Sequence, residues 1–299
     1  GGVLQRRGAT RRHRGVSRLT RAASTCVAPV GELTADVERS FAGCEDERLR
    51  VLLQGLVRHL HAFAVEVQLT EAEWQRAIAA LTATGRLTDD RRQEFVLWSD
   101  ALGLSMLVDA IAHPKPEGAT ESTVLGPFWV EGSPELEYGD AIFTSAAGEP
   151  ACVHGRVLDL GGSPIADATL DVWQNDANEL YGVQDDDAPE AHLRGRFRSR
   201  SDGTYAFLGV RPVPYRIPSD GPVGTMLAAS GRHPWRPAHI HMIIAAPGYE
   251  TLTTHIFDAE SPYLDNDAVF AVKPSLLRRF VRDGDRWSVE NDVILVPVP

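Results

Sequence analysis

Residues 236–244 read Arg-Pro-Ala-His-Ile-His-Met-Ile-Ile, and this run predicts a β-strand. On a strand, residues two apart project from the same face, so His239 and His241 would point together. Ile240 and Met242 would point into the opposite, apolar layer. Two imidazoles on one side of a strand are able to share a metal ion, but neighbouring histidines are also common as structural residues. The pair alone therefore leaves both interpretations open.

The chain around this strand, from residue 117 onward, consists of short alternating or β-branched runs separated by Gly, Pro, Asn and Asp. Short strands at such spacing predict a β-sandwich. The predicted strands are 151–158, 168–173, 204–208, 238–245, 251–257 and 293–298. The connections 175–194 and 211–236 are longer than a compact sandwich needs, so we expect the functional site there.

The N-terminal part has a different pattern, because apolar residues recur at helical spacing from about residue 31 to residue 111. One helix face carries Leu49, Leu52, Leu53, Leu56, Val57, Leu60 and Phe63. A second helix is predicted to begin with a capping box formed by Thr70 and Glu73, and to end at Gly85. A third run, from about residue 89 to residue 111, stops before the prolines at 114 and 116. The fold class predicted is mainly β with an α-helical N-terminal region.

Composition limits the classes of function. The chain has 43% apolar and 24% charged residues and a formal net charge of −11. The acidic balance argues against nucleic-acid binding, and the absence of a long apolar run argues against a membrane-spanning protein. Cys26, Cys44 and Cys152 have no CxxC spacing, so neither a disulfide framework nor a thiolate metal site is predicted, and a reducing cytoplasm fits best.

Residues 1–28 form an expected disordered basic tail, because residues 1–21 hold seven arginines and no acidic residue. No apolar segment of the secretory type follows these arginines. A transit-like segment is the alternative that their composition leaves open. The seven arginines are Arg6, Arg7, Arg11, Arg12, Arg14, Arg18 and Arg21.

Two histidines leave a metal ion short of protein ligands. One carboxylate, from Asp258 or Glu260, would complete the facial triad of a ferrous oxygenase. Phenolates from Tyr181 and Tyr215, which lie in the two long connections, would instead select a ferric ion. A third possibility is a non-enzymatic β-sandwich binding module whose histidine pair holds a structural zinc ion. Residue types alone do not choose among these.

Five motifs, in order, resemble the intradiol ring-cleavage dioxygenase family. They are Asp171-Val-Trp-Gln-Asn-Asp176, Leu180-Tyr181, Gly203-Thr-Tyr-Ala-Phe207, Pro214-Tyr-Arg-Ile-Pro-Ser-Asp-Gly-Pro-Val-Gly224 and Arg236-Pro-Ala-His-Ile-His241. The resemblance extends from about residue 33 to residue 280. It implies a prealbumin-like β-sandwich catalytic domain at 117–299 and a helical dimerisation domain at 29–116. It further implies a homodimer, with a phospholipid-like amphiphile as a possible ligand at the dimer interface.

The same resemblance implies an Fe(III) ion held by Tyr181, Tyr215, His239 and His241, with small aromatic diols and O2 as substrates. Tyr215 would act catalytically by leaving the metal and accepting a substrate proton. Arg236 would stabilise negative charge that develops on the ring. His255 stands where catechol-cleaving relatives often carry Gln. It would either hydrogen-bond the reacting diol or fill a polar gap beneath the metal.

Segments 124–128, 215–218, 254–257 and 267–273 resemble the hydroxyquinol branch of the family. This implies cleavage of hydroxyquinol to 3-hydroxy-cis,cis-muconate, which tautomerises to maleylacetate, with catechol or chlorocatechol cleavage to cis,cis-muconates as the alternative. Asp100 offers an acceptor for the additional ring hydroxyl. Two departures, Leu125 and Trp129, would change the size of the pocket. The implied pocket wall is Leu97, Asp100, Val124, Leu125, Gly126, Pro127, Phe128, Ile217, Pro218, Arg236 and Val269.

Overall fold

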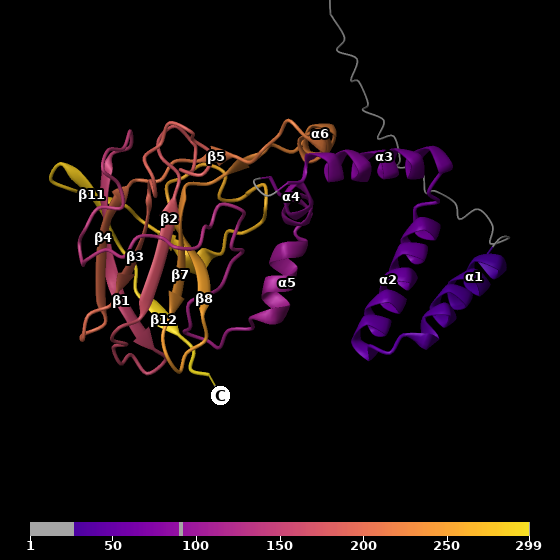
Figure 1. Ribbon diagram of the computed structural model, residues 1–299, viewed down its shortest axis with the longest axis horizontal. Helices are drawn as coiled ribbons and strands as arrows, with labels where there is room; N and C mark the ends of the chain where they lie inside the picture. Colours follow the sequence, from indigo (N-terminus) through magenta and orange to yellow (C-terminus); the bar gives the residue numbers. More distant parts are fainter. Residues whose placement is uncertain (1–26, 90–91, 299) are drawn as a thin grey trace, which may run out of the picture. The chain divides into compact units, whose positions relative to one another are not determined.

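The computed structural model describes residues 27–89 and 92–298 (Figure 1). These residues form two compact units, one ending at Arg76 and the other beginning at Ala77. The predicted basic tail, residues 1–28, lies outside the described residues except for its last two positions. The predicted domain boundary at 116/117 stays a prediction.

The first unit is helical. It contains α1 (Val27–Ser40), a short 3-10 helix (Phe41–Gly43), α2 (Glu47–Glu66) and the start of α3 (Glu71–Leu87). The capping box is confirmed: the Glu73 carboxylate accepts from the Thr70 N–H at 2.9 Å, and the Thr70 hydroxyl accepts from the Glu73 N–H at 3.3 Å. Helix α3 ends at Leu87, two residues beyond the end predicted at Gly85.

The leucine-rich face of α2 is half exposed, although apolar residues at helical spacing usually indicate a face that is buried against the same chain. Leu52, Leu56, Leu60 and Phe63 keep 51–56% of their surface, and α2 has no buried residue within the described chain. Such a row of apolar side chains is more typical of a contact surface than of a solvated helix.

The third predicted helical run is two helices, α4 (Glu94–Ala101) and α5 (Leu104–Ala112), which bend by 77°. Gly103 lies between them with φ +74°, a conformation that favours glycine, so the apolar pattern continued through a break that only the glycine indicates. In the described part of the chain no single helix is long and apolar enough to cross a membrane. Taken together, the bent pair α4 and α5 is long and apolar enough, by length and composition alone.

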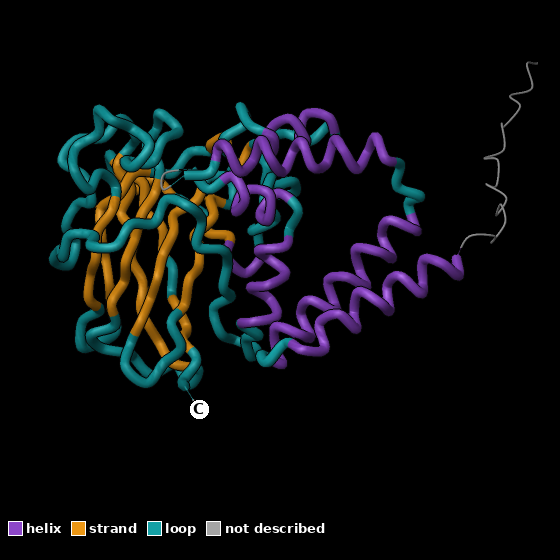
Figure 2. Tube along the Cα trace, turned by 45° about the vertical axis from the view of Figure 1, so that its right-hand side comes forward, coloured by secondary structure: helices purple, strands orange, loops and turns teal. Residues whose placement is uncertain are grey.

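The second unit is built on two five-stranded sheets (Figure 2). One has the order β10-β11-β1-β12, with β4 also paired to β1; the other has the order β3-β2-β7-β8-β9. The first comprises β1 (Pro150–Asp159), β4 (Thr204–Val210), β10 (Val281–Asp283), β11 (Arg286–Glu290) and β12 (Val293–Leu295). The second comprises β2 (Thr169–Gln174), β3 (Arg194–Arg198), β7 (His239–Ala245), β8 (Leu252–Asp258) and β9 (Leu277–Arg278).

Side chains from both sheets form one apolar core. Val153 and Phe207 of the first sheet belong to the same buried cluster as Leu170, Ile240 and Met242 of the second. The alternation predicted for β7 is therefore confirmed, because Ile240 and Met242 enter the core that the two sheets share. The mainly β body with a helical N-terminal region is also confirmed.

The remaining elements lie in the long connections. They are the two-stranded pair β5 (Tyr215–Arg216) and β6 (Trp235–Arg236), helix α6 (Pro222–Ala229) and a 3-10 helix (Pro274–Leu276). In the β5–β6 pair Tyr215 stands opposite Arg236, so this short ribbon brings together two residues that are 21 positions apart.

Candidate metal centre

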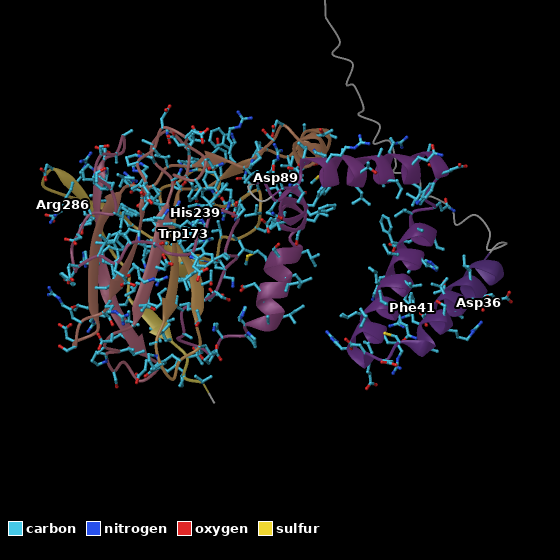
Figure 3. All side chains as sticks on the ribbon, in the orientation of Figure 1. Asp36, Phe41, Asp89, Trp173, His239 and Arg286 are labelled. Carbon is cyan, nitrogen blue, oxygen red and sulfur yellow. The ribbon has the colours of Figure 1, made fainter. Side chains whose placement is uncertain are left out.

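The two histidines lie on β7, which is hydrogen-bonded on both sides. Its neighbours place Trp173 of β2 and His255 of β8 opposite His241. Figure 3 shows His239 and Trp173 among the strands of the second unit. The His239 and His241 Nε2 atoms are 3.1 Å apart, and both side chains are 1% exposed. The same-face arrangement predicted for these residues is therefore present, and it is buried.

The two tyrosines join this pair from the long connections. The Tyr181 hydroxyl lies 3.0 Å from His241 Nε2 and 3.4 Å from His239 Nε2. The Tyr215 ring centre is 5.3 Å from that of Tyr181 and 5.6 Å from that of His239. Four side chains predicted from three motifs thus converge on one buried place, although Tyr181 and His241 are 60 positions apart in the chain.

The connection that carries Tyr181 is fixed by a buried carboxylate. Asp176 accepts from the backbone N–H groups of Ala147, Gly148 and Ala177 and lies 3.0 Å from His192 Nε2. Burial acts to raise the pKa of Asp176, but the hydrogen bonds, led by that from Ala147, outweigh it and hold this pKa below its ordinary value. The Tyr181 N–H in turn donates to Gln184 Oε1 at 3.1 Å.

Each imidazole is oriented by a contact to its Nδ1 atom. His239 Nδ1 lies 2.7 Å from the carbonyl oxygen of Pro237, and His241 Nδ1 lies 2.7 Å from His255 Nε2. Trp173 stacks on His241 with ring centres 4.7 Å apart and an interplanar angle of 14°. These contacts leave both Nε2 atoms directed at Tyr181.

The backbone at Gly126 approaches the imidazole of His241 closely. Its φ is +77°, and a Cβ at this position would lie 3.3 Å from His241 Cε1. Only glycine adopts this backbone conformation readily, and it also leaves room for the histidine ring.

The charges of the site suit neutral nitrogen donors, and without a cation they disfavour the phenolate form of Tyr181. Burial lowers the pKa of His239 and His241 well below the ordinary histidine value, so both rings are neutral at neutral pH and each keeps one lone pair. The lone pair of His239 Nε2 lies 3.2 Å from the Arg236 guanidinium. Burial, followed by the effect of Tyr215, raises the pKa of Tyr181 well above its ordinary value. A bound cation would oppose this effect by favouring the phenolate form.

Arg236 is the buried cation of the site. Its Nε donates to Asp267 at 3.2 Å and its NH1 donates to the Tyr215 hydroxyl at 3.1 Å. Burial acts to lower the pKa of Arg236, but Tyr215 and Asp267 outweigh it, so this pKa lies above its ordinary value. The third guanidinium nitrogen, NH2, is buried and has no partner among the described residues. A buried donor of this kind is suited to an acceptor on a bound ligand.

The carboxylates considered as a third ligand are occupied elsewhere. Asp258 pairs with Arg211 at 2.8 Å, and Glu260 pairs with Arg211 and Arg279. Among His, Cys, Asp and Glu in the described ranges, the group able to hold a metal ion is His239, His241 and His255, without a carboxylate. The facial-triad hypothesis therefore finds no support in this geometry.

The predicted pocket wall is divided between two cavities that share Asp100. The first, of about 600 Å³, is lined by Leu97, Asp100, Pro127, Phe128 and Pro218 from the prediction. The second, of about 420 Å³, is lined by Asp100, Val124, Leu125 and Gly126. Ile217 and Val269 are buried in the apolar cluster that contains Phe128, Tyr181 and Tyr215. Every predicted wall residue thus lies at a cavity, in this cluster or, for Arg236, at Tyr215.

Several residues around the site were not predicted. The first cavity is also lined by Arg92 and Glu94, and Glu94 is fully buried, accepting from the Val223 N–H at the start of α6. Asp267 was also missed as the partner of Arg236, because nothing local in the sequence links positions 31 residues apart. Trp173 belongs to the motif at residues 171–176, but its place opposite His241 follows only from the pairing of β2 with β7.

Comparisons with known proteins agree with the resemblance. Residues 46–120 match the family model "Catechol dioxygenase N terminus", and residues 125–293 match the model "Dioxygenase". The chain is 50% identical to 6-chlorohydroxyquinol 1,2-dioxygenase of Cupriavidus pinatubonensis, over 89% of this chain and 96% of that one. It is 49% identical to hydroxyquinol 1,2-dioxygenase of Rhodococcus opacus, over 89% and 93%.

Among solved structures, hydroxyquinol 1,2-dioxygenase from Pseudomonas putida DLL-E4 superposes with a TM-score of 0.87 at 46% identity, covering 91% of this chain and all of that one. Both family models and the full-length relatives therefore give one answer: the chain belongs to the intradiol ring-cleavage dioxygenase family.

Proposed function

We propose that this protein is a non-haem Fe(III) dioxygenase that cleaves hydroxyquinol between its two adjacent hydroxylated carbons. Both atoms of O2 enter the product, 3-hydroxy-cis,cis-muconate, which tautomerises to maleylacetate. The observation that carries the proposal is the convergence of two phenol oxygens and two imidazole Nε2 atoms in one buried place.

Tyr181, Tyr215, His239 and His241 would hold the iron ion. Phenolate oxygens favour a hard trivalent cation, and neutral imidazoles are good ligands for iron. When bound, Fe(III) supplies Lewis acidity that promotes loss of the diol protons. The buried, unpartnered NH2 of Arg236 fits this assignment, since it offers a fixed donor to an oxygen anion beside Tyr215.

The chain's own residues would then move protons and hold charge. The Tyr215 oxygen, in its phenolate form, is the natural acceptor for one diol proton. Arg236 stays within 3.1 Å of that oxygen and would stabilise negative charge on the substrate. Phe128 and Leu97, both buried at the first cavity, would contact the faces of the aromatic ring.

Asp100 would select hydroxyquinol over catechol. Its carboxyl group is 5% exposed at the wall that both cavities share. Burial raises the pKa of Asp100 above its ordinary value, while a hydrogen bond from Ser105 and the charge of Arg236 oppose this. Ser105 engages only part of the Asp100 carboxylate, and buried acceptor positions without a donor are costly. A ring hydroxyl that donates to Asp100 would therefore be strongly preferred over a ring without one. Catechol or chlorocatechol cleavage is the second candidate, and it requires no partner for Asp100.

We also propose that residues 117–299 form a prealbumin-like β-sandwich catalytic domain and that residues 29–116 form a helical dimerisation domain of a cytoplasmic homodimer. The half-exposed row Leu52, Leu56, Leu60 and Phe63 supports a second copy as the contact partner. A groove of about 530 Å³ between α1 and α2 is lined by small apolar side chains, Ala35, Ala62 and Val65, beside Arg58 and other polar residues, and this mixed lining supports the phospholipid-like ligand.

The test measures iron content, visible absorption and O2 uptake of the purified protein with hydroxyquinol, catechol and chlorocatechol, with identification of the product. We expect about one iron per chain, a phenolate-to-iron charge-transfer band, and ring-opened product with hydroxyquinol preferred. Tyr181→Phe should alter the band, whereas Tyr138→Phe, on an exposed tyrosine, should not. Active protein without iron would refute the proposal. A nearly colourless ferrous enzyme would favour the facial-triad class, and zinc without O2 uptake a binding module.

A further inference from the structure

We propose that His255 is the positioning residue of His241: it fixes the orientation of the His241 ring through a hydrogen-bonded chain that ends at Thr123. This inference rests on the proposed metal centre and adds a residue to it. The chain consists of His241 Nδ1, His255 Nε2, His255 Nδ1 and Thr123 Oγ1, with distances of 2.7 Å between the imidazoles and 3.0 Å to the hydroxyl.

The direction of each hydrogen bond follows from the valence of an imidazole. If His241 binds iron through Nε2, its Nδ1 carries the proton and must donate. His255 Nε2 must therefore accept, so the one proton of a neutral His255 ring resides on Nδ1. That proton is donated to the Thr123 hydroxyl. One arrangement of protons thus satisfies all three side chains, and it requires His255 to remain neutral.

Thr123 is itself held in place. Its backbone N–H donates to the Thr253 carbonyl at 2.9 Å, and its side chain is 3% exposed. His255 is enclosed as well, because it is 1% exposed and its ring meets those of His239 and Phe257 at centre distances of 4.8 and 5.2 Å. The chain of hydrogen bonds therefore has a rigid end, from which it can hold the ring of His241.

The other histidine does not depend on a side chain in this way. His239 Nδ1 contacts the Pro237 carbonyl, which is part of the backbone. His241 is consequently the imidazole whose hydrogen-bonded orientation is set by a replaceable group. Both ring nitrogens of His255 are engaged, so neither is available to the reacting diol. This distinguishes a positioning role from the substrate contact that the sequence left open.

The test uses two matched pairs of variants. His255→Gln keeps one acceptor and one donor, whereas His255→Leu removes both. Thr123→Ser keeps the hydroxyl, whereas Thr123→Val keeps the shape and removes it. The readouts are release of iron to a competing chelator, the position of the phenolate-to-iron band, and kcat and KM measured separately with hydroxyquinol.

We expect His255→Leu to weaken iron retention by about 10- to 100-fold and to shift the band, since groups that orient a metal-bound imidazole have effects of this size. Thr123→Val should change both readouts in the same direction and by less. His255→Gln and Thr123→Ser should stay near the parent protein. If His255→Leu does not fold, the Thr123 pair decides alone, because it changes no ring.

The inference is overturned if His255→Leu, or Thr123→Val in its place, keeps the parent iron retention and band. A rise in KM alone would identify His255 as a substrate contact. It is also overturned if His255→Gln behaves as His255→Leu does. A parent protein that binds no iron would instead refute the proposed function, so the two failures are distinguishable.

Discussion

Replacing Asp267 by Asn should destabilise the protein far more than its small change in shape suggests. Asp267 is 3% exposed, and its Oδ1 accepts from Arg236 Nε at 3.2 Å and from the Val269 N–H at 3.3 Å. Its Oδ2 accepts from the Ala271 N–H at 3.0 Å. Asparagine keeps the volume but removes the negative charge and one acceptor. The Arg236 guanidinium, itself 3% exposed, then has no charged partner at its Nε.

The expected loss follows from these contacts. Removing one member of a buried ion pair costs about 3–5 kcal/mol, mostly because the other charge is left buried and unpaired. The asparagine carbonyl still accepts one hydrogen bond, so we expect the lower end, about 3 kcal/mol of unfolding free energy. Arg236 also contacts Tyr215, and therefore kcat/KM should fall together with stability.

Urea unfolding at equal iron content would measure the loss, with Asp265→Asn as the control. Asp265 is exposed on the same loop and should change the unfolding free energy by less than about 0.5 kcal/mol. The double variant Asp267→Asn with Arg236→Met removes the unpaired charge and should recover most of the lost stability. If Asp267→Asn unfolds like Asp265→Asn, or the double variant recovers nothing, the argument from a buried unpaired charge is wrong.

Three further outcomes are expected. Asp100→Asn should lower kcat/KM for hydroxyquinol relative to catechol by about 10- to 100-fold, because a charged acceptor becomes neutral. Asp186→Asn, at the same cavity, is the control. An unchanged ratio of the two kcat/KM values would show that Asp100 does not select the substrate. Asp176→Asn should lower the unfolding free energy by about 1.5–3 kcal/mol. The pKa of Asp176 is held below its ordinary value, so the stabilisation that Asp176 gives is present above about pH 4 and is lost as the pH falls through the folded-state pKa. Unfolding midpoints measured between about pH 6 and pH 3 should therefore converge for the parent and the variant at the acid end. Parallel curves would contradict this. Gly126→Ala should shift the visible band as well as cost about 1–2 kcal/mol, whereas Gly132→Ala, with a similar φ of +87° and no atom within 4 Å of the added carbon, should show the backbone cost alone.

The sequence predicted those parts of the fold that depend on local pattern. Alternation on β7 placed Ile240 and Met242 in the core, and the motif around Thr70 and Glu73 gave the capping box. It did not predict the break at Gly103, because the apolar spacing continues across that residue and a single glycine is tolerated in many helices.

The candidate site could be predicted only as far as its motifs reach. Tyr181, Tyr215, His239 and His241 come from family motifs, and the geometry brings them together. The residues behind them depend on pairing between distant segments. Thr123 and His255 are 132 positions apart, so their contact follows from the packed structure and not from any local pattern.

The histidine pair lies on an internal strand, whereas the cavity wall lies on helices and loops. The proposed metal binding and the choice of substrate would therefore depend on different parts of the chain, which an engineer could vary independently. A shift of one residue in β7 would turn both imidazoles into the core, so that strand tolerates no insertion. Leu97, Val124, Leu125 and Pro218 lie outside the sheets and carry no such constraint. Libraries aimed at new aromatic feedstocks should therefore randomise these wall positions and leave the strand unchanged.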